Sequence, residues 1–307
     1  DRDRLHDRIR RLLFASPALA RAFARGDFRS VFRGRGIEFD SLRDYSPDDD
    51  ARLIDFRSTL RLGRPFVRTY REDRSLTVFL LVDVSASMDM GSGELSKLDM
   101  AVLASSLVAY AAQFRGLPVG CLVFADRIVG RLAPRRGKAH ALAVAEAAVL
   151  AAAREGRGAL RGDEAALRDQ AEVRGSGLAQ AVRSASLILK RRSLVMVLSD
   201  FRGGDWARPL GELARRHDVV AVRLSDALDL ELPRRGSFGV VDPETGQGAW
   251  LPLGSRGFRG RWRERGLAWR AEAERGLSDA RVPLLELDTS DDPALRLLQF
   301  FERRKGS

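Results

Sequence analysis

Runs of consecutive apolar residues, separated by helical segments, constrain this fold more than any other feature of the sequence. Four such runs are Val78–Val82, Val119–Phe124, Leu194–Leu198 and Val219–Val222. A strand that is apolar on both of its sides needs cover on both faces, which is typical of parallel sheets between two layers of helices. The intervening segments, such as Lys97 to Phe114, are rich in Ala and Leu at helical spacing. The sequence therefore predicts an α/β fold with a doubly wound, mostly parallel sheet flanked by helices.

The chain divides into four stretches of different character. Residues 1–25 are predicted to form an N-terminal helical segment, and residues 26–75 a small β-rich extension. Residues 76–226 carry the alternating strands and helices and form the main predicted domain. Residues 227–307 are predicted to add a hairpin, a long helix, a strand and a closing helix that pack on the same domain.

The composition excludes several classes of function. The single cysteine, Cys121, lies in an apolar run, which indicates a buried thiol and excludes an internal disulfide or a cysteine-based zinc site. The three histidines, His6, His140 and His217, are scattered without metal-ligand spacing and are interpreted as surface or cap residues. No apolar run approaches the roughly 20 residues needed to cross a bilayer. These features favour a chain without a membrane span in a reducing, cytoplasmic setting.

The formal net charge of +11 raises nucleic acid as a partner. The basic residues, however, are spread along the chain and are not interleaved with aromatic residues as stacking platforms would require. A solvated, arginine-rich surface is therefore the preferred interpretation, and a basic nucleic-acid-binding protein remains the alternative.

Oxygen-bearing side chains follow two of the predicted strands. Asp83, Ser85 and Ser87 come directly after the first apolar run, and Asp200 follows the third. Ser176 precedes a predicted helix and could present its hydroxyl to the same edge. Ligands of open α/β sheets bind outside the carboxyl ends of the strands. Carboxylates and hydroxyls without thiol or imidazole suit a hard cation, Mg²⁺ first and Mn²⁺ second, and leave room for an acidic group from outside.

Two other interpretations of these residues stay open. Ser and Asp are common at strand ends and helix starts, where they bind free backbone N–H groups. A metal-dependent phosphohydrolase with Asp83 as nucleophile would need a second acid two residues later, where this chain has Ser85, and no Lys or His is evidently placed to assist. We therefore expect no enzymatic activity. The acidic run Asp48–Asp50 lacks the spacing of a calcium loop and is interpreted as a turn.

The five residues at the strand ends resemble the metal-ion-dependent adhesion site of von Willebrand factor A domains in their order and approximate separation. The flanking sequence resembles a bacterial family known as domain of unknown function 58. That resemblance is carried by the stretch from Arg43 to Phe56, by Asp83 to Met88, and by the tail from Phe300 to Arg304. It covers nearly the whole chain after about residue 25.

The resemblance implies a von Willebrand factor A-like domain that binds an acidic residue of a protein partner through a metal ion. It also implies an adaptor that works with a MoxR-type AAA+ ATPase, or with its client, in protein maturation or complex assembly. The chain departs from the family pattern at Asp48 (Gly in the family), Phe56 (Trp), Ser176 (Thr) and Gly177 (an acidic or amide residue). Ser176 keeps the hydroxyl, whereas Gly177 lacks a side chain that could support the metal ligands through a hydrogen bond.

Overall fold

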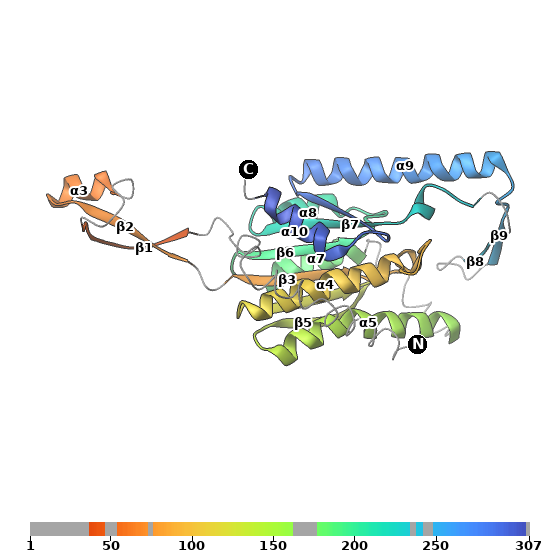
Figure 1. The fold of residues 1–307 in the computed structure, drawn as a ribbon, viewed down its shortest axis with the longest axis horizontal. Coiled ribbons are helices and arrows are strands. Elements are labelled where there is room, and N and C mark those ends of the chain that lie inside the picture. The colour runs from red at the N-terminus through yellow and green to blue at the C-terminus, as the bar shows by residue number, and fades with distance from the viewer. Residues whose placement is uncertain are drawn as a thin grey trace.

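The computed structural model describes residues 37–46, 54–72, 76–161, 177–233, 238–241 and 248–304. The helix predicted at 1–25, the acidic run Asp48–Asp50 and the predicted ligand Ser176 lie outside these ranges. The core of the described chain is a six-stranded sheet (Figure 1). Its strands, in spatial order, are β10 (Leu284–Asp288), β7 (Asp218–Ser225), β6 (Ser193–Ser199), β3 (Thr77–Asp83), β4 (Val119–Phe124) and β5 (Ile128–Arg135).

Five of these strands are parallel, and the edge strand β5 is antiparallel to β4. The connection from β4 to β5 is a short turn, which can join only antiparallel neighbours because a parallel pair needs a long crossover. The first strand of the sheet, β3, lies in its interior, and later strands were added on both sides of it. The predicted α/β class, with a doubly wound and mostly parallel sheet flanked by helices, is confirmed. The strand β10, from the predicted C-terminal extension, belongs to this same sheet.

Helices cover both faces of the sheet, which explains why the inner strands β3, β4 and β6 are almost wholly apolar. In β3, Val78, Leu80 and Val82 pack with one group of helices, whereas Phe79 and Leu81 pack with the other. The first group is α4 (Lys97–Phe114), α5 (Lys138–Arg161) and α10 (Pro293–Arg303); the second is α7 (Gly177–Ile188), α8 (Ala207–Ala214) and α9 (Arg256–Asp279). Full burial of each large apolar side chain stabilises the fold by roughly 1.5–3 kcal/mol. None of the helices in the described ranges is long and apolar enough to span a membrane.

The N-terminal extension forms an arm that stands apart from the main sheet (Figure 1). Strand β1 (Ile37–Asp44) pairs with β2 (Phe66–Glu72), as expected for a β-rich region, but a helix, α3 (Phe56–Leu62), lies between them. Asp55 caps this helix by accepting hydrogen bonds from the next backbone N–H groups, and Gly63 ends it with a φ of 71°. A second hairpin, β8 (Phe238–Val241) with β9 (Gly248–Leu251), lies near one end of α9.

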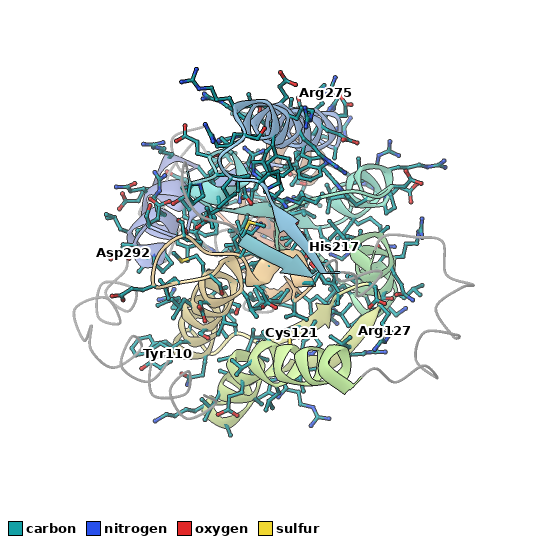
Figure 2. All side chains as sticks on the ribbon, turned by 90° about the vertical axis from the view of Figure 1, so that its right-hand side faces the viewer. Tyr110, Cys121, Arg127, His217, Arg275 and Asp292 are labelled. Atoms are coloured by element: carbon teal, nitrogen blue, oxygen red, sulfur yellow. The ribbon has the colours of Figure 1, made fainter. Side chains whose placement is uncertain are left out.

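Two residues that the composition singled out are buried. Cys121 is 1% exposed, as predicted, and burial raises the pKa of its thiol to about 12. His217 is 3% exposed, and neither ring nitrogen has a hydrogen-bond partner, so its interpretation as a surface or cap residue is wrong. Burial, with Arg216 and Arg192 nearby, lowers the pKa of His217 below 6.5. Figure 2 shows both residues within the layered body, whereas Arg275 projects outward from α9.

Candidate functional site at the carboxyl edge of the sheet

The site begins where β3 and β6 end side by side. The register pairs Val82 with Leu198, so Asp83 and Ser199 are neighbours at the carboxyl edge of the sheet. The Ser199 hydroxyl donates a hydrogen bond of 2.5 Å to Oδ2 of Asp83. The backbone N–H of Ser85 donates one of 2.9 Å to Oδ1. Both carboxylate oxygens are therefore held in place, and each keeps a lone pair that can accept a further partner.

The serine loop after β3 brings two hydroxyls together beside this carboxylate. Ser85 precedes the short 3₁₀ helix η3 (Ala86–Asp89), and the hydroxyl oxygens of Ser85 and Ser87 lie 3.2 Å apart. Both side chains are half-buried, so the loop faces solvent while Asp83 is covered. Two adjacent ligands of an octahedral ion, each about 2.1 Å from it, would lie about 3.0 Å from one another. The hydroxyl spacing therefore suits one Mg²⁺ ion.

The electrostatics of Asp83 favour a cation. The side chain is 5% exposed. Burial, and then the negative charge of Asp200, raise the pKa of the Asp83 carboxyl from 3.8 to about 6, despite the hydrogen bonds from Ser199 and Ser85. The carboxyl is thus ionised at neutral pH, and this buried charge lowers the stability of the folded chain. A positive ion beside it would offset that loss of stability.

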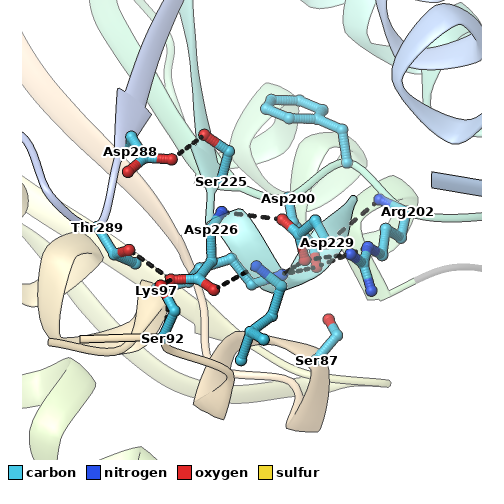
Figure 3. A network of polar contacts seen from close by, with 12 residues as sticks. Ser87, Ser92, Lys97, Asp200, Arg202, Ser225, Asp226, Asp229, Asp288 and Thr289 are labelled. Carbon is cyan, nitrogen blue, oxygen red and sulfur yellow. Dashed lines mark hydrogen bonds and ion pairs between the residues drawn. The ribbon is translucent and has the colours of Figure 1, made fainter. Parts of the chain in front are cut away.

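Asp200 has a different environment, because two basic side chains already bind it (Figure 3). Nζ of Lys97 lies 3.0 Å from Oδ2 of Asp200, and Nε of Arg202 lies 3.3 Å from the same oxygen. Both cations also bind Oδ1 of Asp229, at 3.2 Å for Lys97 and 2.5 Å for Arg202. Burial alone would raise the pKa of Asp200, but Lys97 and then Arg202, with a contribution from the Ser87 hydroxyl, hold it below 3.8. Asp200 is therefore a paired carboxylate, and Asp83 is not.

We call Lys97, Asp200, Arg202 and Asp229 the Lys97 cluster. Local structure holds two of its members, Lys97 and Asp229, in place. Lys97 is the first residue of α4, which starts with a capping box between Ser96 and Asp99. Asp229 ends the short 3₁₀ helix η5 (Ala227–Asp229), directly after β7. Helix α9 holds η5 in place: the Trp262 indole donates a hydrogen bond of 2.8 Å to the Leu228 carbonyl. A Cβ at Gly266 would lie only 2.3 Å from the Asp229 carbonyl oxygen, so only glycine allows this approach.

A further carboxylate, Asp226, ties the loops of this edge together. Its Oδ2 accepts hydrogen bonds from the N–H and hydroxyl of Ser92, at 2.8 and 2.9 Å, and from the Thr289 hydroxyl at 2.5 Å (Figure 3). Burial would raise its pKa, but these bonds and one from Leu228 N–H lower it. Because its donors are neutral, Asp226 takes no part in the ion pairs of the Lys97 cluster. It connects the loop after β3 to the loop after β10.

The structure brings four of the five predicted ligands together: Asp83, Ser85, Ser87 and Asp200. The fifth, Ser176, lies outside the described residues. Within the described ranges, including this edge, no group of three or more His, Cys, Asp and Glu side chains is arranged to hold a metal ion. A cation at this edge would therefore depend on two carboxylates and serine hydroxyls. That oxygen-only donor set fits Mg²⁺ and leaves positions for water or for a ligand from outside.

The sequence missed Lys97, Arg202 and Asp229. The sequence shows no lysine evidently placed to assist Asp83, and the structure brings Lys97 to the neighbouring Asp200. Its ammonium is fully buried and paired with two carboxylates, however, and the residue two after Asp83 is still a serine. Among the described residues, the position two after Asp83 thus carries a hydroxyl and not the carboxyl that a phosphohydrolase would use.

The strand order and this polar edge define a doubly wound α/β domain with a polar site at the carboxyl edge of its sheet. The chain belongs to the family described as protein of unknown function DUF58, whose model matches residues 41–272. An uncharacterized protein of Mycobacterium tuberculosis (strain H37Rv) is 30% identical over 284 residues, which are 92% of this chain and 84% of that protein. An uncharacterized protein of Mycobacterium avium is 34% identical over 137 residues, 44% of this chain and 80% of its own length.

Solved structures show weaker likenesses. An aerotolerance-related membrane protein from Bacteroides fragilis is 14% identical with a TM-score of 0.43, over 75% of this chain and all of that one. The VWA domain of SpRpn10 is 11% identical with a TM-score of 0.35, over 73% of this chain and 94% of that one. These scores are low, so the fold assignment depends on the strand order and connectivity described above.

Proposed function

We propose that this chain is a protein-interaction module whose carboxyl-edge site binds a partner through Mg²⁺. Asp83, Ser85, Ser87 and Asp200, with Ser176, would hold the ion, and an Asp or Glu side chain of the partner would complete its coordination. The observation that carries the proposal is the meeting of a buried, unpaired carboxylate with two solvent-facing hydroxyls 3.2 Å apart. One such contact supplies specificity, and the surface around it must supply most of the affinity.

The partner is proposed from the family resemblance. An adaptor for a MoxR-type AAA+ ATPase, or for its client, would need an acidic side chain that reaches the half-buried serine loop. Mn²⁺ would serve in place of Mg²⁺, because both prefer oxygen ligands. A non-enzymatic role agrees with the serine two residues after Asp83, where a phosphohydrolase would use a carboxyl.

The metal claim predicts a calorimetric difference between the wild type and Asp83→Ala. We expect Mg²⁺ to give a saturable binding heat with the wild type and none with Asp83→Ala, because the unpaired carboxylate is removed. Asp279→Ala, at an exposed carboxylate at the end of α9, should bind Mg²⁺ as the wild type does. Equal heats for all three proteins, or no heat for any, would refute the metal site. A pull-down from cell extract with Mg²⁺ and with chelator then tests whether a partner depends on the ion.

Nucleic-acid binding is a second candidate, favoured by the N-terminal half of α9. Arg256, Arg261, Arg263 and Arg265 are exposed there, and Trp262 lies between them. A phosphate-led mode through these four arginines predicts that affinity for arbitrary duplex falls about 10²-fold between about 0.05 and 0.2 M salt. Arg261→Gln/Arg263→Gln should weaken it further, whereas Arg115→Gln, at the end of α4, should not. Fluorescence anisotropy with labelled duplex measures both, and an affinity that is insensitive to salt excludes this mode.

A further inference from the structure

The Lys97 cluster already contains the positive charge that a metal would bring to Asp200. Lys97 is the only lysine at the carboxyl edge among the described residues, and its side chain has no exposed surface. Its ammonium and the Arg202 guanidinium bridge Asp200 and Asp229 in four ion pairs. Two cations thus offset two carboxylates. Among Asp83, Asp200 and Asp229, only Asp83 then has no basic partner; Asp226, further along the edge, is bound by neutral donors.

We propose that Lys97 is a built-in competitor of the metal, which makes binding of Mg²⁺ at this edge conditional on a carboxylate from the partner. The proposal deepens the proposed function and depends on its metal site. It assigns a role to Lys97, Arg202 and Asp229, none of which is a metal ligand.

Geometry gives the first reason. Oδ2 of Asp200 accepts from Lys97 at 3.0 Å and from Arg202 at 3.3 Å. A Mg²⁺ ion on the same carboxylate would lie about 2.1 Å from its oxygen, and would therefore stand close to both cations. Like charges at such separations repel strongly in a buried site, where water does not screen them. Lys97 can keep Asp229 when Asp200 turns to the metal, because Nζ binds both carboxylates.

Charge balance gives the second reason. Asp83 and the Lys97 cluster together carry a single net negative charge. One Mg²⁺ ion would make this group net positive, which is unfavourable in a covered site. A carboxylate from outside, bound to the ion, would restore neutrality. Metal and partner carboxylate should therefore bind cooperatively, each raising the affinity of the other by the same factor.

Rigidity gives the third reason. If η5 could move away, Lys97 and Arg202 would lose Asp229, and their positions beside Asp200 would no longer be fixed. The indole bond from Trp262 and the close approach of Gly266 hold η5 against α9. Arg202 is further fixed by stacking on the Trp269 ring, 4.7 Å from its centroid. The competing charges therefore stay beside Asp200.

The experiment is a calorimetric Mg²⁺ titration of the wild type and three variants, in potassium chloride and in potassium acetate of equal ionic strength. Acetate is the probe for the partner carboxylate. In the wild type, acetate should raise the Mg²⁺ affinity about fivefold or more. Lys97→Met keeps the length of the side chain without its charge and should bind Mg²⁺ about tenfold more tightly in chloride, with little further effect of acetate. Asp229→Asn should bind Mg²⁺ more weakly than the wild type, because the group then has no net negative charge.

The opposite signs separate this role from a structural one, since mere damage to the site would weaken binding in both variants. Lys190→Met, at an exposed lysine, is the matched control and should behave as the wild type. A folded Lys97→Met with wild-type affinity overturns the proposal, as does an Asp229→Asn that binds as well as the wild type. If Lys97→Met does not fold, the acetate effect in the wild type and the Asp229→Asn affinity decide. If no protein binds Mg²⁺ in either salt, the metal site is refuted, and this proposal with it. If the wild type and Lys97→Met bind Mg²⁺ equally well, only this proposal is refuted.

Discussion

The Asp83→Asn variant is expected to be more stable than the wild type at neutral pH when no divalent metal is present. In the folded chain, burial and the charge of Asp200 raise the pKa of Asp83 from 3.8 to about 6. Ionising this carboxyl at neutral pH therefore costs the fold on the order of 3 kcal/mol, which sets the upper limit of the gain. Asn keeps an oxygen for the Ser85 N–H and presents an amide to the Ser199 hydroxyl. We expect a gain of about 1–3 kcal/mol in the free energy of unfolding, measured by chemical denaturation with chelator.

The pH dependence of this gain identifies its cause. Between pH 3.8 and about 6 the folded Asp83 binds more protons than the unfolded one. The contribution of Asp83 to stability is therefore fully present below pH 3.8 and is lost as the pH rises through about 6. The difference between Asp83→Asn and wild type should grow through this window and then level off. Asp205→Asn, at an exposed carboxylate, is the matched control for the substitution. A difference that is constant with pH, or a variant less stable at neutral pH, contradicts this account.

Saturating Mg²⁺ should stabilise the wild type and not Asp83→Asn, which connects the same carboxylate to the proposed function.

Most of the fold could be predicted because each element carries its own local pattern. Strand β4 and helix α4 lie where the sequence placed them, since continuous apolar runs and helical spacing are visible within single segments. Helix α3 was missed for the opposite reason. Its cap, Asp55, and its terminal Gly63 are present in the sequence, but Phe56 and Leu60 are exposed, so no buried stripe indicates a helix.

The candidate site was predictable only for residues that directly follow a strand, because ligands of α/β sheets bind at the carboxyl ends of the strands. We call this the strand-end rule. Asp83 and Asp200 obey that rule, and Asp226, directly after β7, would have been found by applying it once more. Lys97 and Asp229 could not be found in this way. The ion pairs of Lys97 join residues more than a hundred positions apart, and nothing in the sequence near Lys97 indicates which carboxylates the fold will bring to it.

Gly177 shows how a single position can be misinterpreted from sequence. The sequence marks it as a lost side chain beside the predicted metal, which would weaken the site. In the structure it is the first residue of α7, and a Cβ placed there would lie 1.8 Å from the Ala125 carbonyl oxygen. Ala125 follows β4 at the same edge, where its neighbour Phe124 accepts a hydrogen bond of 2.7 Å from Val84 N–H. The glycine is therefore needed for the close approach of α7 to the loop beside Asp83.

Gly177→Ala is accordingly expected to lower the free energy of unfolding by about 2–4 kcal/mol, because the atoms that it meets belong to the backbone and cannot rotate away. Restoring a larger side chain at this position should therefore impair the metal site by displacing α7, and Mg²⁺ affinity should fall together with stability. Gly260→Ala is the matched control: it lies within α9 with no atom within 4 Å of its Cβ. That change should be neutral or should stabilise the chain by up to about 1 kcal/mol, since alanine is the better helix former. Chemical denaturation compares the two variants, and a Gly177→Ala protein as stable as Gly260→Ala would show that α7 can move away from Ala125 without cost.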